Sequence, residues 1–99
     1  MRLEHLASVI RSKNAGPFQL TLDVFFDDER SFRRAQVSGA MTAPAIAALY
    51  GAEVLGAWFV EPALGWKATL VRSIPAGSPG DGDVFGAQQH MPLLDLEIP

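Results

Sequence analysis

Two polar stretches of the chain carry most of the side chains that suit binding or chemistry. The first runs from Arg11 to Pro17 and brings together two cations, a hydroxyl and an amide: Arg11, Ser12, Lys13 and Asn14. Arginine and lysine pair with carboxylates and phosphates, and serine and asparagine add hydrogen bonds. Gly16 has no Cβ, so the backbone there can approach a ligand closely. The pattern predicts a substrate-binding loop for an anionic group, and the alternative is a surface loop with two solvated cations.

The second stretch spans residues 77–90 and is rich in glycine. It holds two carboxylates, Asp81 and Asp83, which suit a hard cation or the orientation of a catalytic group. The alternative for these aspartates is a solvated glycine turn.

Three polar side chains close the same stretch. The amides of Gln88 and Gln89 can hydrogen-bond a carboxylate or a carbonyl, and the imidazole of His90 can accept and donate a proton. The alternative for His90 is a structural histidine. The sequence therefore offers His90, Asp81 and Asp83 as candidate catalytic residues, and Gln88 and Gln89 as candidate substrate-binding residues.

Familiar ligand loops do not fit the glycine-rich stretch. A phosphate-binding P-loop needs glycine followed by lysine and then serine or threonine, whereas Asp83 follows Gly82. An EF-hand loop that began at Asp81 would need a glutamate at its twelfth position, where Pro92 stands. The chain has no cysteine and two histidines, so no transition-metal site is predicted, and no cofactor is identified.

Composition limits the class of protein. With 99 residues, 48% hydrophobic and 19% charged, the chain is predicted to form one small globular domain over residues 1–99. This apolar surplus fits an interface as well as a core. The net charge of −3 argues against nucleic acid as a partner. Neither a signal peptide nor an apolar run near 20 residues is recognised, so we expect no membrane partner and a cytoplasmic location.

Hydrophobic periodicity predicts the elements that position these side chains. Residues 18–26 alternate between apolar and polar and predict a half-buried strand, whose inner face starts at Phe18. Two helices follow, over 29–36 and over 43–50. We expect their N-caps at Asp27 or Asp28 and at Thr42, their ends at Gly39 and Gly51, and these inward apolar residues: Phe32, Ala35, Ala45, Ile46, Leu49 and Tyr50.

Further strands are predicted over 53–60, 66–72 and 93–98, with a long loop over 74–91. Residues 3–10 have helix-compatible spacing, with Leu3 as part of a short strand as the alternative. The short connection at 61–65 makes the strands on either side antiparallel. The predicted fold is α+β: a ferredoxin-like two-layer sandwich with a mostly antiparallel sheet and short helices on one face. Its second helix is missing or reduced within the long loop.

Several segments also carry a resemblance to known proteins. They are Leu3-Glu-His-Leu-Ala, Arg11-Ser-Lys-Asn-Ala-Gly-Pro-Phe, Thr21-Leu-Asp, the stretch from Gly77 to His90, and Leu93-Leu-Asp. In these the chain resembles a family of small bacterial proteins known only as a domain of unknown function. It is also similar in pattern to the ferredoxin-fold domain that ends AtuA-type proteins, named for acyclic terpene utilisation. The acidic residue of their Arg-Ser-Gly-Asp-Lys-Gly loop has no counterpart in residues 11–16.

The resemblance implies a two-component system, in which a large AtuA-type subunit carries most of the substrate pocket and this chain completes it. Hydratase or lyase chemistry on a carboxylate or acyl-CoA substrate is the reaction class it implies. Arg11, Lys13 and Asn14 would then bind the anionic group, and His90 or an aspartate would move a proton. Two alternatives stay open: a non-catalytic assembly module, and a stand-alone homo-oligomer that binds a ligand.

Overall fold

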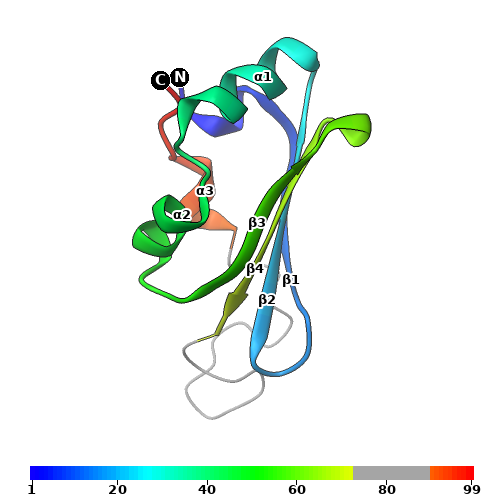
Figure 1. The fold of residues 1–99 in the computed structure, drawn as a ribbon. Coiled ribbons are helices and arrows are strands. Elements are labelled where there is room, and N and C mark those ends of the chain that lie inside the picture. Colours follow the sequence, from blue (N-terminus) through cyan, green and yellow to red (C-terminus); the bar gives the residue numbers. More distant parts are fainter. Residues whose placement is uncertain (73–89) are drawn as a thin grey trace.

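The computed structural model describes residues 1–72 and 90–99. Three strands and two helices appear where periodicity predicts them, and one further strand lies in the N-terminal part of the chain (Figure 1). In chain order the elements are the 3-10 turn η1 (Leu3–His5), β1 (Ala7–Asn14), β2 (Gln19–Phe26), α1 (Glu29–Ser38), α2 (Ala43–Tyr50), β3 (Val54–Val60), the 3-10 turn η2 (Glu61–Ala63), β4 (Gly65–Val71) and α3 (Met91–Leu94).

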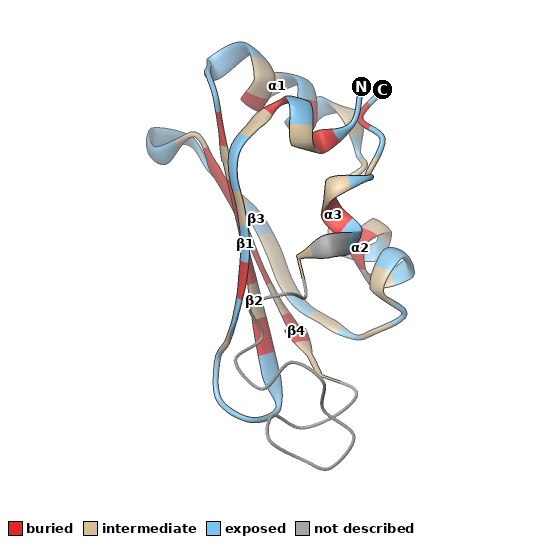
Figure 2. Cartoon of the chain, turned by 180° about the vertical axis from the view of Figure 1, so that it is seen from behind, coloured by how far each residue is buried: buried red, intermediate tan, exposed pale blue. Residues whose placement is uncertain are grey.

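The four strands form one antiparallel sheet in the order β1-β2-β4-β3. β2 and β3 are parallel to each other, because β4 lies between them and is antiparallel to both. A split βαβ unit of this kind, with its helices on one face of the sheet, is the central part of a ferredoxin-like sandwich. The predicted α+β architecture is therefore confirmed, and the opposite face of the sheet is left without a helix layer in the described structure (Figures 1 and 2).

The fourth strand is not where the sequence analysis expected it. Residues 93–98 do not form a strand: Pro92 stands in the first turn of α3, and the strand-like pairing that these residues make with the rest of the described chain is an isolated bridge between Arg2 and Glu97. β1 takes the edge position next to β2 instead. The predicted loop over residues 11–17 is correspondingly wrong, because Arg11–Asn14 pair with β2 and the turn comes only afterwards, at a left-handed Gly16.

The helix boundaries follow the predicted capping residues. The side chain of Asp28 accepts a hydrogen bond of 2.8 Å from the N–H three residues on, and this bond lowers the pKa of its carboxyl group. Thr42 caps α2 in the same way. Gly39 and Gly51 end the two helices with φ values of 75° and 60°, a conformation that glycine adopts without strain.

The core lies between the helices and one face of the sheet (Figure 2). Phe32 is fully buried on α1 and meets the rings of Phe26 and Phe59, with centroids 5.9 and 5.4 Å away. On β4, the indole N–H of Trp66 donates to the carbonyl of Met41 at 3.1 Å. The other residues of the buried cluster are Leu3, Leu6, Leu20, Leu22, Val24, Ala35, Ile46, Ala68, Leu70, Leu93 and Ile98.

Two apolar residues predicted to face the core do not. Phe18 lies before β2, in the turn, and is 60% exposed. Leu49 is exposed on α2, where Ile46 alone is fully buried and Tyr50 is partly so. Burial raises the pKa of the Tyr50 hydroxyl.

The two ends of the chain meet beside the helix layer (Figure 1). The backbone N–H of Leu3 donates to the carbonyl of Leu96 at 2.8 Å, and that of Ile98 donates to Met1 at 2.8 Å. The ammonium group of Met1 pairs with Glu97, which lowers the pKa of that carboxyl group. Among residues 1–72 and 90–99, no helix is long and apolar enough to span a bilayer.

A matched pair of substitutions tests this account of the core. Phe32→Ala should lower the free energy of unfolding by about 3–5 kcal/mol, because it leaves a cavity among buried rings. Phe18→Ala removes the same atoms from an exposed turn and should change stability by less than about 0.5 kcal/mol. Urea unfolding followed by tryptophan fluorescence measures both. Similar losses for the two variants would contradict the assignment of the core.

Candidate functional site

A row of four side chains crosses the sheet at one level. The strand register places Arg11 of β1 opposite Asp23 of β2, Asp23 opposite Lys67 of β4, and Lys67 opposite Trp58 of β3. Successive side chains of a strand point to opposite faces, and the neighbours of Asp23 and Lys67 point into the core. The row therefore lies on the face of the sheet opposite the helices, which we call the open face.

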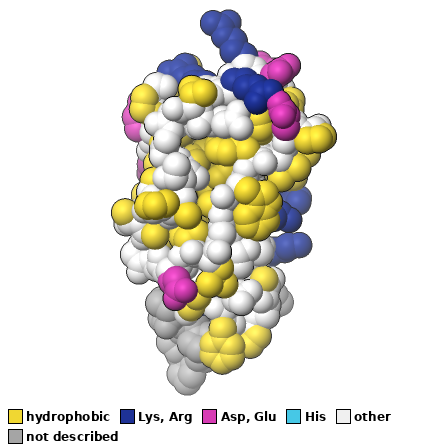
Figure 3. Space-filling model, in the orientation of Figure 1, with side chains coloured by type: hydrophobic (Ala, Val, Ile, Leu, Met, Phe, Trp, Pro, Cys, Tyr) yellow, Lys and Arg dark blue, Asp and Glu magenta, His cyan; other side chains and the backbone are white. Residues whose placement is uncertain are grey.

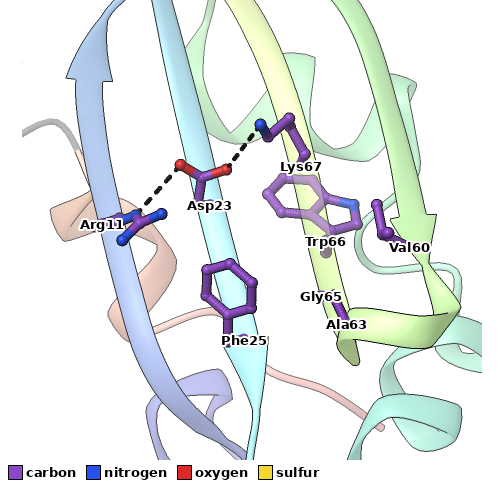
Figure 4. Close-up of a pocket in the computed structure, with 8 residues that line it drawn as sticks. All are labelled: Arg11, Asp23, Phe25, Val60, Ala63, Gly65, Trp66 and Lys67. Carbon is purple, nitrogen blue, oxygen red and sulfur yellow. Dashed lines mark hydrogen bonds and ion pairs between the residues drawn. The ribbon is translucent and has the colours of Figure 1, made fainter.

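Asp23 is the centre of this row. Only 3% of Asp23 is exposed, although it lies on the open face. Arg11 Nε donates to its Oδ2 at 3.4 Å, and Lys67 Nζ lies 3.6 Å from its Oδ1 (Figure 4). The two cations remain about half exposed. Each carboxylate oxygen thus faces one cation, which is the arrangement that lets a buried charge persist.

A shallow hollow of about 220 Å³ adjoins the row on the side of the β3–β4 connection. Its apolar lining comes from Phe25, Val60, Ala63 and Gly65, and Arg11, Asp23 and Lys67 form its charged side (Figure 4). The Arg11 guanidinium lies 5.3 Å from the centre of the Phe25 ring, within the range of a cation–π contact. The hollow therefore combines two cations with an apolar wall.

Gly65 shapes the floor of the hollow. It pairs directly with Phe25 across the β2–β4 ladder. A Cβ at Gly65 would stand 3.2 Å from an edge carbon of the Phe25 ring, a close contact that the ring would have to move to relieve. Glycine at this position therefore lets the ring lie against the strand.

The predicted substrate-binding residues of β1 divide between the two faces of the sheet. Arg11 and Lys13 are exposed on the open face, whereas Ser12 is buried on the helix-facing side and Asn14 is half-buried there. The four side chains therefore do not converge in one loop as predicted, because a strand alternates its side chains. Lys13 lies one row beyond Arg11, opposite Thr21, and does not line the hollow.

The remaining predicted residues lie in or beside the segment that follows β4. Asp81, Asp83, Gln88 and Gln89 fall outside the described residues. His90 is half-buried and directly precedes α3. Arg72, which directly precedes this segment, lies beside the start of β2, where its backbone N–H donates to the carbonyl of Phe18, and its side chain reaches across to donate to the side-chain oxygen of Asn14. That residues 11–16 and 77–90 share a pocket stays a prediction.

Sequence reasoning missed Asp23 and Lys67 as site residues. Both lie in strands that were predicted, on faces that were predicted to be polar. The sequence does contain one signal, which is a single charge in the middle of each of two apolar strands. The sequence does not show how the strands pair. Only the register of the sheet reveals that Asp23 lies opposite both Lys67 and Arg11.

A metal centre has no support in the described parts of the chain. Within them, His, Asp and Glu side chains do not gather in groups of three or more that could hold a metal ion. The open-face row also presents more cations than carboxylates, which suits an anion better than a metal.

Comparison with known proteins identifies the family. The chain belongs to the family described as Domain of unknown function (DUF4387), which it matches over residues 3–97. No curated protein and no solved structure gives a significant match. The predicted membership of a family of unknown function is therefore confirmed, and the similarity to AtuA-type proteins stays a prediction.

A mutant cycle tests whether the two cations act together on Asp23. Arg11→Ala and Lys67→Ala should each cost less than about 1 kcal/mol of stability, because the other cation still neutralises the carboxylate. The double variant should lose about 1 kcal/mol more stability than the two single variants lose together, because the buried Asp23 carboxylate then has neither cation. Urea unfolding measures the cycle. In an Asp23→Asn background the excess should vanish, and additive losses in both backgrounds would contradict the shared role.

Proposed function

We propose that this chain is the small subunit of a two-component AtuA-type enzyme that acts on a carboxylate or acyl-CoA substrate. The observation that carries the proposal is the open face, where exposed apolar side chains surround a cationic row. The reaction class, hydratase or lyase, comes from the sequence resemblance alone. The large subunit would cover the open face and supply most of the substrate pocket.

Exposed apolar side chains support a docking role for this face. Trp58 is 46% exposed beside Lys67, and Val9 and Val60 are also exposed at the two ends of the next row, which runs through Phe25 and Gly65. Figure 3 looks onto the β3 edge of the molecule rather than onto the open face, and hydrophobic side chains are prominent on that edge as well. A sheet face that meets only water normally carries polar side chains. Burial of apolar area of this kind is the usual driving force for association.

The charges of the open face favour a different chain over a second copy. Arg11, Lys13 and Lys67 contribute three positive charges and Asp23 one negative charge, so the row and its neighbour carry a net charge of about +2 at neutral pH. Two such faces would repel each other if they were stacked in a homodimer. If a larger subunit covered the open face with an anionic substrate between the two chains, the substrate would neutralise this positive charge.

The proposed roles of individual residues follow from this arrangement. Arg11 and Lys13 would contact the anionic group from the open face, and Gln88 and Gln89 would hydrogen-bond the substrate or its carrier, whereas Ser12 and Asn14 lie on the helix-facing side of β1 and take no part in binding at the open face. His90, with Asp81 or Asp83, would transfer the proton. Support comes from the contact between the side chains of Arg72 and Asn14, because it joins the residue before that segment to the end of β1.

The same exposed apolar residues favour a second candidate function, a non-catalytic assembly module. In that case the open face would join a partner without contact to substrate. Association and turnover separate the two candidates, since only the enzymatic role makes turnover depend on Arg11 and His90.

Co-expression with an AtuA-type large subunit tests the proposal. Trp58→Ser should abolish co-purification, because it removes the most exposed ring of the open face. Val37→Ser removes an apolar side chain that is 82% exposed on α1 and should leave the complex intact. Within an intact complex, His90→Ala should lower kcat by about 100-fold or more and Arg11→Ala should lower kcat/KM about tenfold.

The outcomes distinguish the candidates. A complex that survives Trp58→Ser, or that never forms while the isolated chain is a stable homo-oligomer by light scattering, would contradict the subunit role. A complex whose turnover is unaffected by both Arg11→Ala and His90→Ala would instead identify an assembly module.

A further inference from the structure

We infer that the hollow beside Arg11, Asp23 and Lys67 binds a small free carboxylate that carries a short apolar body. Arg11 and Lys67 would hold the carboxylate, and Asp23 would act as a positioning residue that fixes both cations. The claim that this hollow belongs to an enzyme's substrate site rests on the proposed function. The inference deepens that function by adding Lys67 and Asp23 and by choosing a free acid over a coenzyme thioester.

Charge selects a monoanion. Arg11 and Lys67 carry two positive charges and Asp23 one negative charge, so the three groups together carry +1. A monocarboxylate would neutralise them. A phosphate dianion would leave a net negative charge beside the buried Asp23 carboxylate, which is costly where water is excluded.

Geometry leaves the two cations available to a ligand. Nε of Arg11 donates to Asp23, and in the described structure the guanidinium has no other acceptor from the protein. The Arg11 and Lys67 side chains are 58% and 47% exposed, whereas that of Asp23 is 5% exposed. Asp23 thus lies below the cations and a ligand would lie above them. An arginine fork held in this way can pair with both oxygens of a carboxylate.

Size and lining select the rest of the ligand. A volume of about 220 Å³ lies below the range of roughly 300–1,000 Å³ that is typical of sites for drug-sized molecules and cofactors. Coenzyme A would not fit, whereas an acid with a few carbon atoms would. The apolar wall of Phe25, Val60 and Ala63 starts beside the cations, so a short carbon chain would lie on it when the carboxylate is bound.

Titration of the isolated chain tests this site without the large subunit. Butanoate, acetate and inorganic phosphate are added in turn, and the backbone amide shifts of the protein are followed by NMR. Butanoate should bind at roughly millimolar affinity, with saturable shifts at Arg11, Gly65 and Lys67. Acetate should bind several-fold more weakly because it lacks most of the apolar body.

Variants assign the binding to the row. Arg11→Ala and Lys67→Ala should each weaken butanoate binding about tenfold. Arg30→Ala removes the same charge from α1, outside the hollow, and should leave the affinity within about twofold. The amide spectrum of each variant shows whether it is folded.

Three results would overturn the inference. They are no saturable shifts at Arg11 and Gly65, phosphate binding at least as tight as butanoate binding, or an equal loss of affinity in Arg30→Ala. None of them bears on co-purification with the large subunit, so the site can fail while the proposed subunit role holds. Loss of co-purification with intact butanoate binding would be the reverse case.

Discussion

The buried carboxylate of Asp23 is the constraint that links the fold of this protein to its candidate site. A charge at this depth persists only if cations neutralise it, and the cations come from the strands on either side, as Arg11 and Lys67. A shift of either strand by one residue would turn its cation to the helix-facing side and leave the carboxylate alone. The electrostatics of the open face and the register of the sheet therefore depend on each other.

The same register arranges both faces of the sheet. On the helix-facing side it aligns Leu22 with Ala68 and Val24 with Trp66, which pack beneath α1 and α2. On the open face it aligns the cationic row and sets Phe25 against Gly65. Because the side chains of the other face pack in the hydrophobic core, that packing fixes the strands that carry the open-face side chains. The core residues thus position the open-face side chains.

Much of the fold was predictable from local signals. Alternation identified β2 and β4, and the capping residues Asp28, Thr42 and Gly51 marked helix ends that the structure confirms. β1 escaped prediction because residues 11–14 are polar and lead into a turn, so their strand structure depends on pairing with β2. Residues 94–98 alternate between apolar and acidic as a strand would, but a helical turn occupies residues 91–94 and the rest pairs with the N-terminus through the isolated bridge at Glu97.

The site was less predictable than the fold. Residue type singled out Arg11 and Lys13, whereas Asp23 and Lys67 become site residues only through contacts between strands distant in sequence. Family membership does not add a reaction, because the family is itself of unknown function. The fold does not add one either, since one fold supports many activities. Function therefore has to be argued from the open face.

The role of Asp23 can be tested by measuring the butanoate affinity of Asp23→Asn. An effect of net charge and an effect of positioning change that affinity in opposite directions. Asp23→Asn raises the charge of the row from +1 to +2, and charge alone would strengthen the binding of butanoate. If Asp23 instead positions Arg11 and Lys67, its loss should weaken butanoate binding about tenfold in a folded variant, as measured by NMR titration. Weaker binding is the predicted result. Unchanged or tighter binding would contradict the central claim that this buried carboxylate organises the site.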